Sequence, residues 1–156
     1  MGRTARGVNG IRLRKGDSVV SMAVVEPEGT LLTVTDRGYG KRSRIEDYRL
    51  QTRGGQGVLN IRTTQRNGRV VAAPFVRDED ELMVITAQGM IMRLRVKDFA
   101  VHTRVTQGVR LIELGEGDHV VAGREARGEG RGRGSYELTT SSNPRAPSPR
   151  HRPRTR

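Results

Sequence analysis

The sequence contains no cysteine and no tryptophan, and its aromatic residues amount to three tyrosines and two phenylalanines. Without cysteine the chain can form neither a disulfide framework nor a thiolate metal site. No apolar run approaches the ~20 residues that a membrane-spanning helix needs, and the basic N-terminus lacks the apolar stretch of a secretory signal. These absences favour a soluble cytoplasmic protein whose core consists of Val, Ile, Leu and Met, residues that suit short strands.

Acidic residues are scarce relative to basic ones: 17 against 29, which gives a net charge of +12. The first 123 residues hold 20 basic and 14 acidic residues, and the last 33 hold 9 and 3, so each part carries half of the excess. Such a balance favours a polyanionic partner, nucleic acid first, although a solvated basic surface would give the same numbers.

Residues that could carry catalysis are scattered. The three histidines show no spacing that would gather them on a metal, and we interpret the acidic run Asp78–Glu81 as a solvated hairpin tip. The stretch Gly38–Gly40 is too short for a phosphate-binding loop and lacks the Lys-Ser/Thr that would follow in one. The sequence therefore predicts no catalytic residue, no metal, no cofactor and no small-molecule substrate, and we expect that the chain alone is not an enzyme.

The sequence does contain a repeat of about 50 residues. Versions of the stretch Gln51–Val58 stand before and after it, so that Arg3, Arg53 and Arg104 are 50 and 51 residues apart. In each copy a glycine is followed by valine and, four residues after the glycine, by isoleucine. A fixed period of this size is typical of propeller-like arrays, in which each repeat is one four-stranded antiparallel blade.

This period divides the chain into repeats at about 2–50, 51–101 and 102–123, followed by a tail over 124–156. The tail is rich in Gly, Pro, Ser and Arg, and such a composition cannot bury enough apolar surface to offset the entropy of ordering. We therefore predict a folded all-β part over residues 1–123 and a disordered basic tail over 124–156. Two full units and a fragment would form an incomplete ring.

Strands are predicted where apolar runs lie between turn signals. In the first repeat we expect a short strand, a strand buried on both faces and a hairpin, at Gly7–Leu13, at Ser18–Val25, and at Leu31–Thr35 with Lys41–Ile45. The second repeat aligns with the first and gives strands at Gly57–Arg62, Val70–Val76, Leu82–Thr86 and Met92–Val96.

The last of these strands shows how one unit can both pack and carry charge. Over Met90–Lys97, three apolar residues alternate with three cations, Arg93, Arg95 and Lys97. A period of two places the cations together on one face of the strand, and Arg42 and Arg44 stand at the matching places of the first repeat. A solvated strand face protected against edge pairing would look similar, but the recurrence favours a functional basic rim.

Several stretches resemble the C-terminal domain of the bacterial DNA gyrase A protein, namely Gly10–Met22, Gly38–Tyr48, Arg66–Val71 and Thr106–Ile112. The resemblance covers almost all of residues 2–123 and implies a β-pinwheel, a propeller-shaped ring of six blades that trade strands with their neighbours. In that family the domain wraps duplex DNA around its basic perimeter. The chain resembles about the last two blades.

A second resemblance concerns a seven-residue motif of the family, the gyrase box, in which a Gln is followed by basic residues and glycines. The matching residues are Gln51, Arg53, Gly54, Gly55 and Gly57. Thr52 and Gln56 stand where the box has basic residues, and in the family the full box belongs to the first blade. We interpret this copy as a structural turn, with direct phosphate contact through Arg53 as the alternative.

The resemblance implies a non-catalytic DNA-binding and DNA-wrapping portion of a type IIA topoisomerase, because the family's catalytic tyrosine lies in a separate N-terminal region that this chain does not contain. Its partners would be double-stranded DNA, the remainder of gyrase A and the gyrase B protein, at the nucleoid. The expected DNA-binding residues are Arg42, Arg44, Arg53, Arg93, Arg95 and Lys97. Bending a short site costs ~1–6 kcal/mol, so two blades are expected to bind DNA weakly without wrapping it.

Two alternatives remain open. The chain could be a structural fragment that docks on the rest of a split or truncated topoisomerase, since repeat units of this kind need about three neighbours for stability. It could also be the equivalent domain of topoisomerase IV, which differs mainly by loss of the first-blade box.

Overall fold

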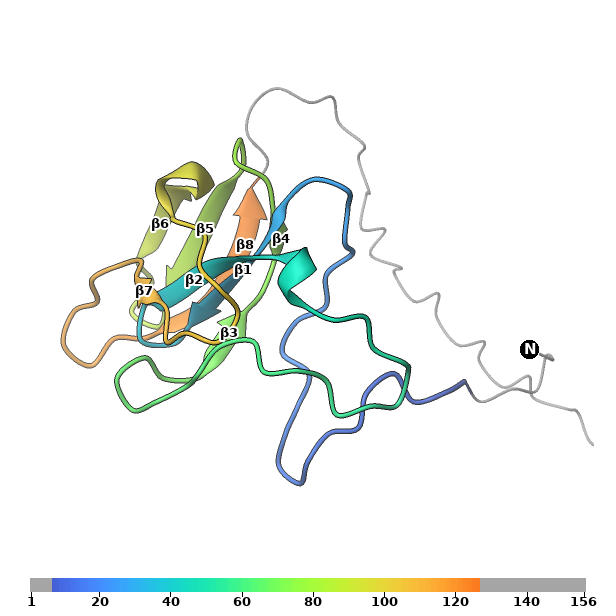
Figure 1. The fold of residues 1–156 in the computed structure, drawn as a ribbon. Coiled ribbons are helices and arrows are strands. Elements are labelled where there is room, and N and C mark those ends of the chain that lie inside the picture. The colour runs from blue at the N-terminus through green and yellow to red at the C-terminus, as the bar shows by residue number, and fades with distance from the viewer. Residues whose placement is uncertain (1–6, 127–156) are drawn as a thin grey trace, which may run out of the picture.

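The computed structural model describes residues 7–126, and every regular element in this range is a short β-strand or a single turn of 3-10 helix (Figure 1). The first repeat supplies β1 (Thr30–Thr35), β2 (Tyr39–Arg44) and η1 (Ile45–Asp47). The second supplies β3 (Val70–Ala72), β4 (Phe75–Val76), β5 (Glu81–Thr86), β6 (Ile91–Arg95) and η2 (Val96–Asp98), and the third supplies β7 (Val109–Arg110) and β8 (Val120–Ala126). The predicted all-β class is confirmed.

Two hairpins form the centres of two sheets. In the first, β1 pairs antiparallel with β2, and in the second β5 pairs antiparallel with β6. The first turn is closed by the Gly38 N–H, which donates to the Thr35 carbonyl at 3.1 Å. Gly38 has a φ of 75°, a conformation that glycine adopts without steric cost. Both predicted hairpins are confirmed.

Each hairpin is completed by a strand from the following repeat. β3 and β4 both pair antiparallel with β1, and β8 pairs antiparallel with β5. β3 and β4 occupy one strand position that is interrupted at Pro74, because proline has no N–H to donate to the ladder. With β7 beside β2, the sheets read β3/β4–β1–β2–β7 and β6–β5–β8. This is the exchange of strands between neighbouring blades that a β-pinwheel implies.

The prediction of a doubly buried strand at Ser18–Val25 is wrong. The segment forms no strand, and Met22 and Val24 are 92% and 79% exposed. In Figure 1 it runs in a loop beside the sheets, within the blue part of the chain. Its counterparts in the later repeats pair with the hairpin of the repeat before them, and no hairpin precedes this segment in the part of the chain that the structure describes. Because this apolar run has no strand to pair with, its backbone N–H and C=O groups form hydrogen bonds with water and the segment stays exposed.

The predicted strands at Gly7–Leu13 and Gly57–Arg62 are also absent. Each segment contributes a single parallel bridge, Ile11 with Gly55 and Ile61 with Thr106. The partner in both cases is a turn of the next repeat, which is too short to extend a ladder. These segments therefore dock one repeat on the next without forming a blade strand.

One apolar core joins the two sheets. Leu32 and Val34 of β1 pack with Leu82 and Val84 of β5, and all four are at most 1% exposed. The cluster is completed by residues from the connecting strands and turns: Ala72, Val76, Val96, Ile112 and Val120. Burying an aliphatic side chain of this size contributes ~1.5–3 kcal/mol, so the two hairpins stabilise each other.

The predicted end of the folded part at residue 123 is three residues too early. β8 continues to Ala126, and Arg124, Glu125 and Ala126 are in register with Met83, Leu82 and Glu81. The sequence signal failed there because the composition of the strand end is that of the tail. The rest of the predicted disordered tail, residues 127–156, lies outside the described residues.

Candidate nucleic-acid interface

The cationic face predicted on β6 and η2 has the expected geometry. Arg93, Arg95 and Lys97 are exposed, while the residues that alternate with them, Met92, Leu94 and Val96, are half-buried or buried. The alternation arises because successive side chains of a β-strand point to opposite faces of the sheet, and one face of β6 packs on the core. β6 is also the edge strand of its sheet, with β5 on one side only. The three cations therefore point away from the core along one outer edge of the molecule.

Two of these cations already have carboxylate partners. The Arg93 guanidinium forms an ion pair with Glu81, and Arg95 Nε donates to Asp98 Oδ2 at 3.0 Å. The arginine side chains are 56% and 64% exposed, and their partners Glu81 and Asp98 are 26% and 49% exposed. Ion pairs that are open to water on the arginine side contribute ~0–1 kcal/mol. Such arginines can exchange a carboxylate for a phosphate at little cost.

Arg44 is the first-repeat counterpart of Arg95. It ends β2, opposite Thr30 of β1, and its side chain is exposed. No ion pair of Arg44 is found among residues 7–126, so it is available to an anionic ligand.

The structure does not support Arg42 as a residue of an exposed rim. Its side chain is 5% exposed, and every part of the guanidinium is bonded within the protein. Nε donates to Thr30 Oγ1 at 3.0 Å, and Nη1 donates to the carbonyls of Val96 and Phe99 at 3.1 and 3.2 Å. Nη2 pairs with Asp78, so the acidic run that begins there is more than a solvated hairpin tip. Arg42 thus fixes the second repeat against the first, and its burial keeps it from a phosphate.

The box-like turn from Gln51 to Gly57 docks on the first repeat through its backbone. The Gly54 N–H donates to the Gly10 carbonyl at 3.0 Å, and the Arg12 N–H donates to the Gly55 carbonyl at 2.7 Å. Gly54 has a φ of 75°, which explains why glycine is needed there. The side chains of Gln51 and Arg53 are exposed.

The third copy of this turn repeats the same docking. The Arg62 N–H donates to the Thr106 carbonyl at 3.0 Å. Arg104, the counterpart of Arg53, donates from Nε to the Asp47 carbonyl at 3.1 Å and from Nη1 to the Leu59 carbonyl at 2.6 Å. These contacts favour the interpretation of the turn as structural, whereas a phosphate contact of Arg53 stays a prediction.

Lys41 is a buried cation that the strand pattern alone does not single out. Its Nζ donates to the Thr103 carbonyl at 2.9 Å and to the Arg104 carbonyl. Burial lowers the pKa of the Lys41 ammonium to about 8, an effect that the nearby Asp47 partly opposes. Met92 stands at the matching place in the second repeat. The sequence could have indicated the burial of Lys41 only through this exchange of a charged residue for an apolar one.

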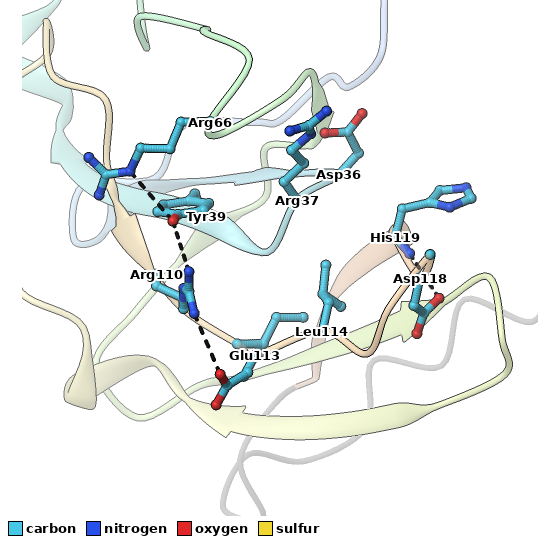
Figure 2. A pocket seen from close by; sticks show the side chains of 11 residues that line it. Asp36, Arg37, Tyr39, Arg66, Arg110, Glu113, Leu114, Asp118 and His119 are labelled. Atoms are coloured by element: carbon cyan, nitrogen blue, oxygen red, sulfur yellow. Dashed lines mark hydrogen bonds and ion pairs between the residues drawn. The ribbon is translucent and has the colours of Figure 1, made fainter.

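A further group of cations lies around Tyr39, whose place in the repeat indicates a packing or rim residue. Figure 2 shows the Arg66 and Arg110 side chains on opposite sides of the tyrosine ring. Arg66 Nε donates to Tyr39 Oη at 3.5 Å and Arg110 Nη2 donates to it at 3.2 Å. The two Cζ atoms lie 5.1 and 5.6 Å from the ring centroid, within the range of cation–π contacts.

These residues border a cavity of about 540 Å³. Hydrogen bonds from Arg66 and Arg110 lower the pKa of the Tyr39 hydroxyl, because both guanidinium groups favour the phenolate. Sequence reasoning missed the cluster because Arg66 and Arg110 are 44 residues apart and meet only through the pairing of β7 with β2. The available signal was the aromatic residue in a protein that has so few.

The fold is that of strand-exchanging blades in a propeller-like array, with basic residues on outer strands. The family model described as "DNA gyrase C-terminal domain, beta-propeller" matches residues 1–26, 29–73 and 80–124. The chain belongs to this family, as a partial copy of the C-terminal domain of DNA gyrase A.

Curated relatives agree with this assignment. The DNA gyrase A protein of Thermotoga maritima is 49% identical over 118 residues, which are 74% of this chain and 15% of the relative. The DNA gyrase A protein of Staphylococcus epidermidis is 48% identical over 122 residues, 77% of this chain and 14% of the relative. The chain therefore spans about 14–15% of the length of the relatives it matches.

Solved structures share the fold. The DNA gyrase A C-terminal domain superposes with a TM-score of 0.71 at 26% identity, covering 77% of this chain and 41% of that one. The C-terminal domain of DNA topoisomerase IV gives a TM-score of 0.73 at 24% identity, covering 79% and 39%. Among residues 7–126, the structure contains no helix that is long and apolar enough to cross a membrane.

Proposed function

We propose that this chain is a non-catalytic DNA-binding portion of a type IIA topoisomerase, which contacts duplex phosphates through exposed cations on its outer strands. The observation that carries the proposal is the cationic face of Arg93, Arg95 and Lys97, on an outer strand of a member of the gyrase C-terminal family. Arg44 stands at the place that matches Arg95 in the first repeat. Arg53 is an additional candidate, and Arg42 is left out because it is buried.

Binding of this kind would be electrostatic and would depend little on DNA sequence. Contacts to phosphates position a protein on the duplex without reading bases, and each neutralised phosphate steepens the dependence of affinity on salt. We expect binding in the micromolar range or weaker, without stable wrapping, since a two-blade arc is short compared with the bending cost of DNA. Support of DNA supercoiling would then require the remainder of gyrase A together with gyrase B.

The test is the affinity of the full chain for a short DNA duplex as a function of salt concentration. The charge-reversal pair Arg93→Glu and Arg95→Glu lowers the net charge from +12 to +8, since each substitution removes one positive charge and adds one negative charge. We expect at least a tenfold loss of affinity at low salt and a salt slope that is smaller by about two.

A matched control is the pair Arg12→Glu and Arg14→Glu, which changes the net charge by the same amount on exposed residues of the same spacing. An equal loss of DNA affinity in both double variants would show that binding depends only on net charge. The DNA-binding site could then no longer be assigned to β6. A third variant replaces tail arginines by glutamine at positions 145, 150, 152, 154 and 156. If this variant alone abolishes binding, the tail and not the blades holds the DNA.

A second candidate function has its own observation. Among residues 7–126, the exposed apolar segment Ser18–Val25 has no hairpin to pair with, whereas its counterparts do. The chain could therefore serve as a structural portion that docks on the rest of a topoisomerase. Co-purification of the full chain with the remainder of gyrase A would test it. Loss of that association in Val24→Asp, with DNA affinity unchanged, would favour docking as the main role.

A further inference from the structure

The Tyr39 cluster is absent from the second repeat. Met90 stands at the place that matches Tyr39, and Gly117 at the place that matches Arg66. Arg110 lies directly opposite Tyr39 in the pairing of β7 with β2, so the cluster is assembled from three repeats. A feature made by three repeats and present once is not explained by the common packing of the blades.

Two arginines converge here on a neutral acceptor. Elsewhere among the described residues, the arginines in ion pairs face carboxylates at short range, as Arg42 faces Asp78. Tyr39 Oη accepts one hydrogen bond from Arg66 and one from Arg110, and these occupy both of its lone pairs. The hydroxyl therefore supplies no negative charge to the two guanidinium groups, and its own proton is left for another acceptor.

Most donors of the two guanidinium groups remain available. Within residues 7–126, Arg66 uses only Nε, and Arg110 uses Nη2 for Tyr39 and Nη1 for a long ion pair with Glu113 at 3.6 Å. Both side chains are exposed at their outer ends, whereas Tyr39 is 8% exposed and holds a fixed position. The planar forks of arginine suit the oxygens of a phosphate group.

Two of the acidic groups that line the same cavity have one carboxylate oxygen bonded within turns. Asp36 Oδ1 accepts from the Arg69 N–H at 2.9 Å, and Asp118 Oδ1 accepts from the N–H groups of Gln88 and His119 at 3.1 and 2.8 Å. Both carboxylates close turns, and Figure 2 shows Asp118 and His119 at the end of the cavity away from Tyr39. Glu113 is the one carboxylate beside the arginines within the described part of the chain, and its side chain is 87% exposed.

We propose that Arg66 and Arg110, positioned by Tyr39, form a clamp for one phosphodiester group of bound duplex DNA. The inference rests on the proposed function and extends it to a place that the strand pattern did not indicate. Two arginine forks would bind the two non-bridging oxygens, and the Tyr39 hydroxyl would donate the third hydrogen bond. Such a clamp would give the first hairpin a phosphate contact of its own, since Arg42 is buried there.

The experiment compares Arg66→Gln, Arg110→Gln and the double variant in the full chain, using the same duplex and salt series. Because both arginines hold one phosphate, each single variant should lose about as much affinity as the double variant, roughly three- to tenfold. The salt slope of the double variant should fall by about one, not two. Tyr39→Phe keeps the ring and removes the hydroxyl, and should give a smaller loss in the same direction.

The matched control is Arg12→Gln with Arg14→Gln, which removes the same charge from exposed residues outside the cavity and should change affinity by less than about twofold. The clamp would be overturned if the fold-loss of affinity in the double variant equalled the product of the two single losses and its salt slope fell by two. The two arginines would then contact two separate phosphates. A double variant that binds like the unmodified chain would overturn the clamp as well.

A second measurement tests phosphate binding at Arg66 and Arg110 without the use of DNA. Inorganic pyrophosphate is titrated into the 15N-labelled full chain, and the arginine Nε–Hε resonances are followed by NMR. Shifts of Arg66 and Arg110 without a shift of Arg12 would support a phosphate site at these two arginines. If the unmodified chain then binds no duplex DNA, the phosphate site stands, while the proposed function and the assignment of duplex DNA as its ligand fail. The absence of any selective shift would overturn the clamp, whatever the duplex affinity.

Discussion

The β1–β2 and β5–β6 hairpins have the same pairing, yet matching residues in them have opposite environments. Leu32 lies opposite Arg42 in the first hairpin, and Met83 lies opposite Arg93 in the second. Arg42 is buried and bonded to two carbonyls of the second repeat, while Arg93 is more than half exposed and paired with Glu81 of its own hairpin. The same residue type at the same register thus performs two different physical roles.

The environments of Arg42 and Arg93 differ because of the repeat that packs beside each hairpin, and not because of the hairpins themselves. η2 and the residue after it supply the carbonyls that hold Arg42, and nothing among the described residues occupies the corresponding place beside Arg93. Later repeats complete the first hairpin elsewhere as well, since β7 of the third repeat pairs with β2. The environment of a residue is therefore decided by the presence of the next unit, and substitutions at these two arginines test this conclusion most directly.

The largest change in stability is expected for Arg42→Ala. The substitution removes the hydrogen bonds to Thr30 Oγ1 and to the carbonyls of Val96 and Phe99 and the ion pair with Asp78. It also opens a cavity between the repeats, so we expect a loss of ~2–4 kcal/mol in the free energy of unfolding. Arg93→Ala removes one exposed ion pair and should cost less than ~1 kcal/mol. Urea denaturation of the full chain, followed by circular dichroism, measures both values.

Arg42→Lys serves as the control for charge, since it keeps the cation and loses the guanidinium fork that reaches several acceptors at once. A cost close to that of Arg42→Ala would show that geometry holds the repeats together. Equal costs for Arg42→Ala and Arg93→Ala would contradict the comparison, because they would place both arginines in the same environment.

A second pair of matching residues tests the same conclusion with a smaller effect. Val76 of β4 is fully buried against β1, whereas Val25, its counterpart in the first repeat, is 57% exposed. We expect Val76→Ala to cost ~2 kcal/mol, from the lost transfer free energy and the cavity. Val25→Ala should change the free energy of unfolding by less than ~0.5 kcal/mol.

The same urea series supplies the measurement, and fusion of a β1–β2-type hairpin ahead of residue 7 supplies the control. With that hairpin present, Val25→Ala should become as costly as Val76→Ala, since the segment would then have a strand to pair with. A cost near ~2 kcal/mol for Val25→Ala in the unmodified chain would show that Ser18–Val25 is already packed.

Local patterns predicted the elements that depend on their own residues. The hairpins of β1–β2 and β5–β6 followed from apolar runs and from the glycine turn at Asp36–Gly38, because register and turn geometry are set within a few residues. Ser18–Val25 was predicted as a strand from the same kind of signal and is not one. Its pairing partner belongs to another repeat, which no local pattern contains.

The candidate site shows the same division. The face of Arg93, Arg95 and Lys97 could be predicted from a period of two along one strand. The burial of Arg42 could not, since it depends on carbonyls of Val96 and Phe99 that are more than 50 residues away. The Tyr39 cluster could not either, because strand pairing between repeats brings its arginines together.

The smallest expected effect concerns Lys41, a cation of the first hairpin at the place where the second hairpin has Met92. Its pKa in the folded protein is about 8, against an ordinary value of 10.5, because burial disfavours the ammonium. Below pH 8 both the folded and the unfolded chain hold the proton, and the folded state carries the full cost of burying it. Between pH 8 and 10.5 the unfolded state binds more protons, so stability should rise with pH in this window.

Lys41→Met places the second repeat's residue, Met92, in the first repeat and should remove this rise. We expect the unmodified chain to gain up to about 1 kcal/mol between about pH 7.5 and 8.5 relative to the variant, measured by urea denaturation at both pH values. The tyrosines and other lysines are common to both proteins, so their titration cancels in the difference. A difference that stays constant with pH would show that the Lys41 ammonium remains charged throughout, held by the carbonyls of Thr103 and Arg104. The positive charge of Lys41 would then stabilise the contact between the repeats and would not weaken it.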